Sequence, residues 1–328
     1  MSVAESGPLD DKGENPVGTV GPEEAVRPSV DSESAPDRVF FASDPSDSTY
    51  DEVRDRLEED GIEVEDLDPD GIDCEGGEFY LNGEPVSELD ASVYLRPKRW
   101  TDVGEDWEGF SDLLQLQAYS SIDFYGDPHT AVLAEDKKAT KNVFRNLGIG
   151  VVDDLSYDEA LKQVEEGEEV VVKPRFNSSH GNGVEAVSSQ SRLETYREDI
   201  LEGDYLVEDK LEHGEDSENA DMRMVLTGDD FYRAERVGGD GVASNISNGG
   251  DYRDPDPLSF EEFEMYRKAS EAFGNGFISI DYVREEDGSV NVMEINSTSY
   301  TSIDEHLDDN LYDSIAEGLE SSFSGGGV

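Results

Sequence analysis

The chain has 328 residues, enough for about two ordinary domains, and its 81 acidic residues against 25 basic ones give a formal charge of -56 at pH 7. This charge argues against nucleic-acid binding, which needs a basic face, and the single cysteine, Cys74, excludes an internal disulfide. No apolar run approaches the ~20 residues of a membrane span, which predicts a cytoplasmic protein with no membrane contact. The acidic residues are spread over nearly every predicted helix and turn, which favours a high-salt cytosol.

The N-terminal third of the chain is predicted to hold a leader and a small α/β domain. Residues 1–37 are rich in Ser, Pro, Gly and acidic residues and nearly lack large apolar side chains, which predicts a disordered acidic leader. Residues 38–128 then alternate strand and helix patterns, which predicts the α/β domain. Its predicted elements are a buried strand at 38–42, a helix at 48–60, a strand that ends in a turn at Asn82 and Gly83, a strand at 91–95 and a helix at 106–120.

The next segment carries a lysine at the end of an apolar strand. A helix that contains Lys137 is followed by a continuous apolar strand at 169–174, which includes Lys173. Directly after it comes a loop of small residues, 175–184, that returns to a strand. Such a loop can lay backbone N–H groups over phosphates while Lys173 neutralises them, and residues 178–183 would close over a nucleotide. An ordinary hairpin with an exposed lysine is the simpler alternative.

Further strands are predicted in the second half of the chain. Residues 205–211 form a strand pattern that runs into a polar segment, where backbone groups could hold an adenine ring and a later acid could bind ribose hydroxyls. Two more strands follow at 221–226 and 231–237. Arg233 and Arg236 are three residues apart on the second of these, so they face opposite sides, and we prefer Arg236 for a shared pocket. Either arginine could instead pair with a neighbouring acid.

Two strands near the C-terminus end in oxygen ligands. Residues 277–283 and 290–296 alternate apolar and polar side chains, as two strands of a hairpin would. Such a hairpin places Asp281 across from the end of the second strand, where Glu294 and Asn296 share one face. Three hard oxygen donors in one small volume suit Mg²⁺ or Mn²⁺ holding the phosphates of a nucleotide. Because the chain is so acidic, the two carboxylates on these strands could also be ordinary surface groups without a binding role.

The order of these features resembles the ATP-grasp superfamily, and most of all its RimK-type carboxylate–amine ligases. The resemblance runs from about His129 to Ile315, and its most recognisable part is the tetrapeptide Met-Glu-Ile-Asn that ends at Asn296. It implies an α+β ATP-grasp fold over residues 129–320, in which two α+β subdomains clasp the nucleotide, after the small α/β domain. A flexible glycine-rich tail is predicted at 321–328.

The resemblance also implies a site for ATP and a divalent metal ion. The residues that it places at the nucleotide are Lys137, Lys173, Glu208, Lys210, Leu211, Glu215, Asp221, Ser244 and Asn245. The residues that it implies for catalysis are Arg236 and Lys173, and those for Mg²⁺ or Mn²⁺ are Asp281, Glu294 and Asn296. The implied reaction joins a carboxylate to an amine through an acyl phosphate, with ADP released. Its substrates would be small molecules or peptides, with a protein as a further acceptor class.

Two departures from the family pattern prevent the acceptor from being carried over. The family's Pro-Gly after the last metal ligand is replaced by Ser299 and Tyr300, and an expected arginine is Ala243. Residues 92–97 and 250–253 also show a fainter likeness to the ATP-grasp maturases of graspetide (microviridin-type) peptides. Two alternatives therefore stay open: a peptide-maturing ligase, and a nucleotide-binding or structural protein that kept the fold and lost ligation.

Overall fold

The computed structural model describes residues 36–43, 48–96, 107–176, 183–210, 220–227, 230–238, 250–274, 276–285, 288–297 and 311–322. The predicted leader lies outside this part of the chain except for Pro36 and Asp37. The last helix, α9 (Leu311–Ser322), includes the first two residues of the predicted tail. Among the described residues, no helix is both long and apolar enough to cross a membrane.

The predicted α/β domain contains a four-stranded parallel sheet. Its strand order is β2–β1–β6–β7, formed by β1 (Arg38–Ser43), β2 (Glu63–Asp66), β6 (Ala91–Arg96) and β7 (Asp123–Tyr125). Helix α1 (Ser48–Glu59) packs on the face of Val39 and Phe41, and α2 (Trp107–Tyr119) on the face of Phe40 and Ala42. Because helices cover both faces, β1 is apolar throughout its centre, which is why its position was predictable.

A short antiparallel sheet follows β2 in the sequence. It consists of β3 (Ile72–Glu75), β4 (Glu78–Leu81) and β5 (Glu84–Pro85). The predicted turn after Leu81 is confirmed, since Asn82 and Gly83 both have positive φ angles, 47° and 87°. Asn and Gly tolerate this left-handed backbone better than other residues, so the sequence specifies the turn.

A second sheet carries the lysine strand. Its antiparallel order is β11–β10–β12–β9, formed by β9 (Asp154–Leu155), β10 (Val170–Pro174), β11 (Glu185–Val187) and β12 (Tyr205–Asp209). The helices that accompany it are α5 (Tyr157–Glu166), α6 (Gln190–Leu193) and α7 (Arg197–Glu202). Val170 and Val172 pack into the core with α5, so alternation along β10 turns Lys173 to the other face. The two strands of the predicted strand–loop–strand arrangement are therefore confirmed as β10 and β11.

Two consecutive helices connect the α/β domain to this sheet. They are α3 (Pro128–Glu135) and α4 (Lys137–Asn146), and each begins after an aspartate that caps it, Asp127 and Asp136. Helix α4 ends at Asn146 with Leu147 as its C-cap, and Gly148 follows with a φ of 68°.

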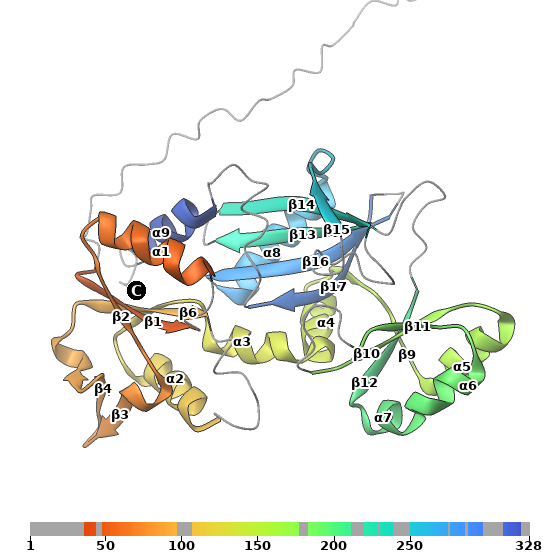
Figure 1. Ribbon diagram of the computed structural model, residues 1–328, viewed down its shortest axis with the longest axis horizontal. Helices are drawn as coiled ribbons and strands as arrows, with labels where there is room; N and C mark the ends of the chain where they lie inside the picture. The colour runs from red at the N-terminus through yellow and green to blue at the C-terminus, as the bar shows by residue number, and fades with distance from the viewer. Residues whose placement is uncertain are drawn as a thin grey trace, which may run out of the picture. The chain divides into compact units, whose positions relative to one another are not determined.

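Among the described residues, the largest sheet has six strands in the order β15–β14–β13–β16–β17–β8, and Figure 1 shows β14, β13, β16 and β17 side by side. The strands are β8 (Gly150–Val151), β13 (Ala220–Thr227), β14 (Asp230–Gly238), β15 (Gly250–Arg253), β16 (Phe277–Arg284) and β17 (Val290–Asn296). All neighbours are antiparallel except β17 and β8. Helix α8 (Phe260–Phe273) packs on the face of Met224 and Ile280, and α9 on the face of Val225 and Phe277.

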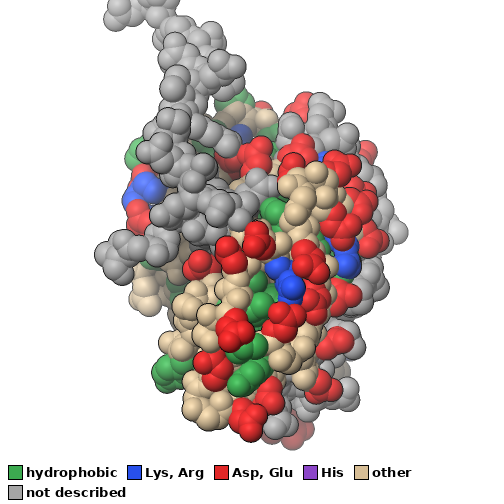
Figure 2. Space-filling model, turned by 90° about the vertical axis from the view of Figure 1, so that its left-hand side faces the viewer, with side chains coloured by type: hydrophobic (Ala, Val, Ile, Leu, Met, Phe, Trp, Pro, Cys, Tyr) green, Lys and Arg blue, Asp and Glu red, His purple; other side chains and the backbone are tan. Residues whose placement is uncertain are grey.

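Acidic side chains are spread over the surface. On the face shown in Figure 2, Asp and Glu side chains are scattered across the described elements with few Lys or Arg side chains between them. This distribution agrees with the charge of -56 for the whole chain. Dispersed charges repel one another less when salt screens them, so a preference for high salt stays a prediction.

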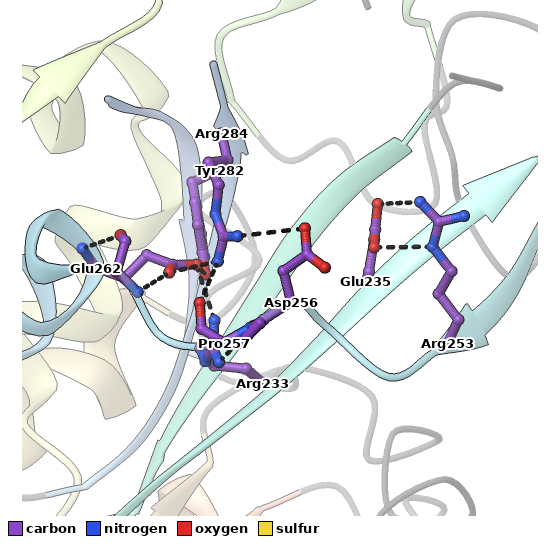
Figure 3. Close-up of polar contacts among 9 residues, drawn as sticks. Arg233, Glu235, Arg253, Asp256, Pro257, Glu262, Tyr282 and Arg284 are labelled. Carbon is purple, nitrogen blue, oxygen red and sulfur yellow. Dashed lines mark hydrogen bonds and ion pairs between the residues drawn. The ribbon is translucent and has the colours of Figure 1, made fainter. Parts of the chain in front are cut away.

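A buried carboxylate, Glu262, stabilises the packing of α8 on the large sheet (Figure 3). Arg284 donates to it at 2.5 Å, Tyr282 at 2.6 Å and Arg233 at 3.0 Å. Glu262 also closes a capping box with Ser259 at the start of α8. Burial alone would raise the pKa of Glu262, but the hydrogen bonds from Arg284 and Tyr282 outweigh burial and lower its pKa from 4.5 to about 2.

Acid should remove the stability that Glu262 provides. A carboxyl whose pKa is lower in the folded state stabilises that state fully above its unfolded value of 4.5, and the contribution falls as pH approaches the folded value of about 2. The lowering corresponds to on the order of 3 kcal/mol at neutral pH. Glu262→Gln is therefore expected to lower the free energy of unfolding at pH 7 and to differ less from the wild type below pH 4.

Urea unfolding at molar KCl between pH 7 and pH 2.5 measures this difference. Glu261→Gln is the matched control, because Glu261 is the preceding residue of the same helix and is exposed. A gap between wild type and Glu262→Gln that stays constant over the whole pH range would contradict the prediction.

Candidate nucleotide and metal site

Two arginines share one buried aspartate on the large sheet. Arg223 donates to both oxygens of Asp281, from Nε to Oδ1 and from Nη2 to Oδ2, each at 2.8 Å. Nη2 of Arg236 lies 3.1 Å from Oδ2 of Asp281, and its Nε donates to Oδ1 of Asp221 at 2.6 Å. Arg223 is the cross-strand partner of Asp281, and Arg236 that of Asp221, so all four side chains lie on one face.

The two guanidinium groups keep Asp281 ionised although it is only 2% exposed. Burial alone would raise the pKa of Asp281, but the positive charges of Arg223 and Arg236 outweigh burial and lower its pKa to about 2. Burial alone would lower the pKa of Arg236, and the negative charges of Asp281 and Asp221 raise it instead. The cluster therefore holds two permanent cations in fixed positions, paired with two carboxylates.

The prediction that Arg233 and Arg236 face opposite sides of β14 is confirmed. Arg233 binds Glu262 of α8, on one side of the sheet, whereas Arg236 binds Asp221 on the other side. Alternation along the strand separates the two arginines, and only Arg236 joins the cluster around Asp281.

The predicted C-terminal hairpin is also confirmed. Strands β16 and β17 pair antiparallel with Asp281 directly opposite Glu294, and the register shifts by a bulge between Asp281 and Tyr282. Nδ2 of Asn296 donates to Oε1 of Glu294 at 3.4 Å, so these two side chains share one face. The Glu294 side chain is 28% exposed, which leaves its oxygens accessible to a ligand.

The oxygen atoms of the three predicted metal ligands differ in how far other side chains already occupy them. Glu294 and Asn296 are adjacent and partly exposed. Both oxygens of Asp281 accept hydrogen bonds from guanidinium groups, so a metal ion would have to use its remaining lone pairs. Within the described part of the chain, no three Asp, Glu, His or Cys side chains form a metal site, so the amide of Asn296 would have to complete the set. This oxygen-only donor set fits Mg²⁺ or Mn²⁺, and the metal assignment stays a prediction.

Lys137 brings a positive charge to the same place. Its Nζ lies 3.8 Å from Oε2 of Glu294, and its side chain is 7% exposed. Asp136, which caps α4, also accepts from Nε of Arg175 at 2.8 Å, and the backbone N–H of Lys137 donates to the carbonyl of Arg175 at 3.2 Å. These bonds tie the start of α4 to the chain just after β10, so the elements that carry Lys137 and Lys173 are held together.

Lys173 is bound to a buried carboxylate. Its Nζ lies 2.6 Å from Oε1 of Glu208, which is only 4% exposed. The same oxygen accepts from Nζ of Lys141, a fully buried residue of α4 that also donates to Asp154 at 2.8 Å. Glu208, predicted to lie at the nucleotide, is thus engaged by two lysines. Sequence reasoning missed Lys141, whose only signal is its place one turn after Lys137 on the same side of the helix.

Of the remaining predicted nucleotide residues, Asp221 belongs to the arginine cluster, Lys210 makes an ion pair elsewhere, and the others lie outside the described residues. Lys210 pairs with Glu169, and its side chain is 38% exposed. Asp221 binds Arg236. The predicted residues outside the described part of the chain are Leu211, Glu215, Ser244 and Asn245, together with Ala243 and most of the 178–183 loop. Arg223 was not predicted, although it is two residues after Asp221 and therefore shares its face of β13.

Comparisons with known proteins give structural matches only. No family model matches the chain, and no curated protein matches it. The ATP-grasp ligase PsnB, solved with a minimal precursor, is 16% identical with a TM-score of 0.65, over 88% of this chain and 99% of PsnB. A further PsnB structure contains a minimal precursor, Mg and ADP.

Two other matches are of similar quality. The macrocyclase MdnC from Microcystis aeruginosa MRC, bound with the precursor peptide MdnA, is 15% identical with a TM-score of 0.63, over 86% of this chain and 98% of MdnC. A RimK domain ATP-grasp protein from Sphaerobacter thermophilus DSM 20745 is 16% identical with a TM-score of 0.60, over 86% of this chain and 99% of that protein. The matches thus span nearly the whole length of each neighbour.

Proposed function

We propose that this chain, whose ATP-grasp fold confirms the prediction from its sequence, is an ATP-dependent carboxylate–amine ligase. In the first step, a carboxylate oxygen of one substrate attacks the γ-phosphorus of ATP, the bond from that phosphorus to the bridging oxygen of the β-phosphate breaks, and ADP leaves. In the second step, the amine of the other substrate attacks the acyl carbon and phosphate leaves with the bonding electron pair. Loss of a proton from nitrogen gives the amide.

The observation that supports this proposal best is the ammonium group beside the predicted metal ligands. Nζ of Lys137 lies 3.8 Å from Glu294, which is the cross-strand partner of Asp281, and Arg236 lies at Asp281. In a chain with a formal charge of -56, a polyanion such as ATP is repelled from most of the surface. A place where cations from several elements meet is therefore the best candidate for its phosphates.

Positioning and charge neutralisation would provide most of the catalysis, because phosphoryl transfer gathers negative charge on oxygen atoms. Lys137 and Lys173 would neutralise the phosphates. Arg236 would stabilise the transferring group, and Arg223 would hold Asp281 so that Arg236 keeps its orientation.

Glu294 and Asn296, with a spare lone pair of Asp281, would hold Mg²⁺ or Mn²⁺. The ion, when bound, supplies further positive charge at the phosphate oxygens. PsnB has been solved with Mg and ADP, which supports this choice of cofactors for a chain of the same fold.

A peptide acceptor is the second candidate, and one contact favours it. Residues 250–253, which carry the fainter likeness to peptide maturases, form β15, and Tyr252 is the cross-strand partner of Arg236. That segment therefore borders the proposed site. PsnB and MdnC were both solved with precursor peptides, while the RimK domain protein matches comparably, so the fold alone does not separate the two acceptor classes.

A phosphate-release screen tests the ligase proposal. ATP and Mg²⁺ are supplied with amino acids and with peptides that carry Asp, Glu or Lys side chains, at molar KCl, because self-repulsion at low salt could unfold the chain. The expected result is phosphate release that depends on both substrates, with a product lighter than their sum by one water. ATP binding without release across the panel would favour a nucleotide-binding protein that has lost ligation. A chain that binds no ATP would contradict both.

A further inference from the structure

Glu208 is a buried carboxylate that binds two ammonium groups at once. Its Oε1 lies 2.6 Å from Nζ of Lys173 and also accepts from Nζ of Lys141. The Lys141 side chain is fully buried, whereas the Lys173 side chain keeps 8% of its surface exposed. Of the two lysines, Lys173 therefore has the route to a bound ligand, and Lys141 does not.

A second carboxylate holds Lys141 in its place. Its Nζ donates to Oδ1 of Asp154 at 2.8 Å, and Arg145, one turn further along α4, donates to Oδ2 of Asp154 at 3.1 Å. Asp154 is also the cross-strand partner of Glu208. Lys141 is therefore fixed between neighbouring strands, and Asp154 would keep Arg145 as a partner if the charge of Lys141 were removed.

We propose that Lys141 is a positioning residue for Lys173. This proposal rests on the function proposed above. In the free protein, Glu208 holds the ammonium group of Lys173 at the site. When Lys173 turns to a phosphate of the nucleotide, Lys141 remains beside Glu208 and keeps that carboxylate paired. Without Lys141, the same movement would leave Glu208 as a buried, unpaired charge, which is costly in a protein interior. Lys141 thus allows Lys173 to exchange one anion for another.

A double-mutant cycle on Lys141 and Glu208, measured by ATP affinity, tests this proposal. Equilibrium binding of ATP with Mg²⁺ is compared at molar KCl for the wild type, Lys141→Met, Glu208→Gln and the double variant. Lys141→Met is expected to weaken ATP binding by about tenfold or more, because Lys173 then has to stay with Glu208. In the Glu208→Gln background, the same change is expected to alter the affinity by less than about twofold, because no buried charge remains to be paired.

Matched variants separate positioning from a general loss of structure. Lys162→Met is the control, since Lys162 is 73% exposed on α5 and pairs with Glu166 one turn away. Lys141→Arg, which keeps the charge, is expected to recover most of the ATP affinity. Thermal unfolding shows whether each variant folds, and Lys141→Gln takes the place of Lys141→Met if the latter does not fold.

The outcomes distinguish this proposal from the function on which it rests. Equal losses of ATP affinity in the wild-type and Glu208→Gln backgrounds would overturn the role of Lys141 and leave the ligase proposal standing. A wild-type chain that binds no ATP would overturn both, and that result is known before any variant is compared.

Discussion

Replacing Lys173 with alanine is expected to abolish ATP-dependent phosphate release. Lys173 would neutralise phosphate oxygens, and the loss of one such preorganised group lowers a rate by about a hundredfold or more. The variant should stay folded, because Glu208 keeps Lys141 as a counter-charge. Glu294→Ala is expected to have an equally large effect through a different cause, the loss of a metal ligand. A phosphate-release assay at molar KCl measures both.

Two further measurements distinguish these causes. In a Mg²⁺ titration followed by ATP binding, the midpoint is expected to shift to higher Mg²⁺ concentrations for Glu294→Ala and to stay unchanged for Lys173→Ala. Lys162→Ala and Glu166→Ala are the matched controls, because both side chains are more than half exposed on α5. Unchanged turnover in both site variants would remove the assignment of this site.

Replacing Asp281 with alanine is expected to lower the free energy of unfolding by about 3–5 kcal/mol, the usual cost of removing one partner from a buried ion pair. Asp281 is bound to Arg223 through two hydrogen bonds and to Arg236 through a third contact. Arg236 would keep Asp221, but Arg223 would lose both bonds to a carboxylate and remain a largely buried cation, 11% exposed, beside another cation. Urea unfolding at pH 7 and molar KCl measures the loss.

The double variant Arg223→Met/Asp281→Leu is the control for this prediction. It removes the largely buried cation of Arg223 together with its partner, so it is expected to recover much of the lost free energy of unfolding. If Asp281 served only as a metal ligand, Asp281→Ala would leave the unfolding free energy of the metal-free protein unchanged, and that result would contradict the structural role inferred from its contacts.

The elements around the site could be predicted because their local patterns are strong. Alternation of apolar and polar residues placed Asp281 across from the end of the second strand, and the structure pairs it there with Glu294. The same alternation separated Arg233 from Arg236. The ATP-grasp fold was predictable because several such elements follow one another in a recognisable order. These inferences need only the period of a strand or a helix, which the sequence states directly.

The partners of the charged side chains could not be predicted in the same way. In a chain with 81 acidic residues, every arginine and lysine has many possible partners nearby in sequence. Arg223 instead binds Asp281, 58 residues away, and Lys141 binds Glu208, 67 residues away. A charged residue on a helix normally faces water, so the place of Lys141 one turn after Lys137 was its only local signal, and that place does not indicate full burial.

The sequence by itself therefore determined the strands, their faces and the candidate ligands at their ends. Only the tertiary structure decided that Asp281 is held by two arginines and that Glu208 is shared by two lysines. The physical reason is that an ion pair in a low-dielectric interior depends on which strands become neighbours, whereas the side to which a residue points depends on the backbone of its own strand.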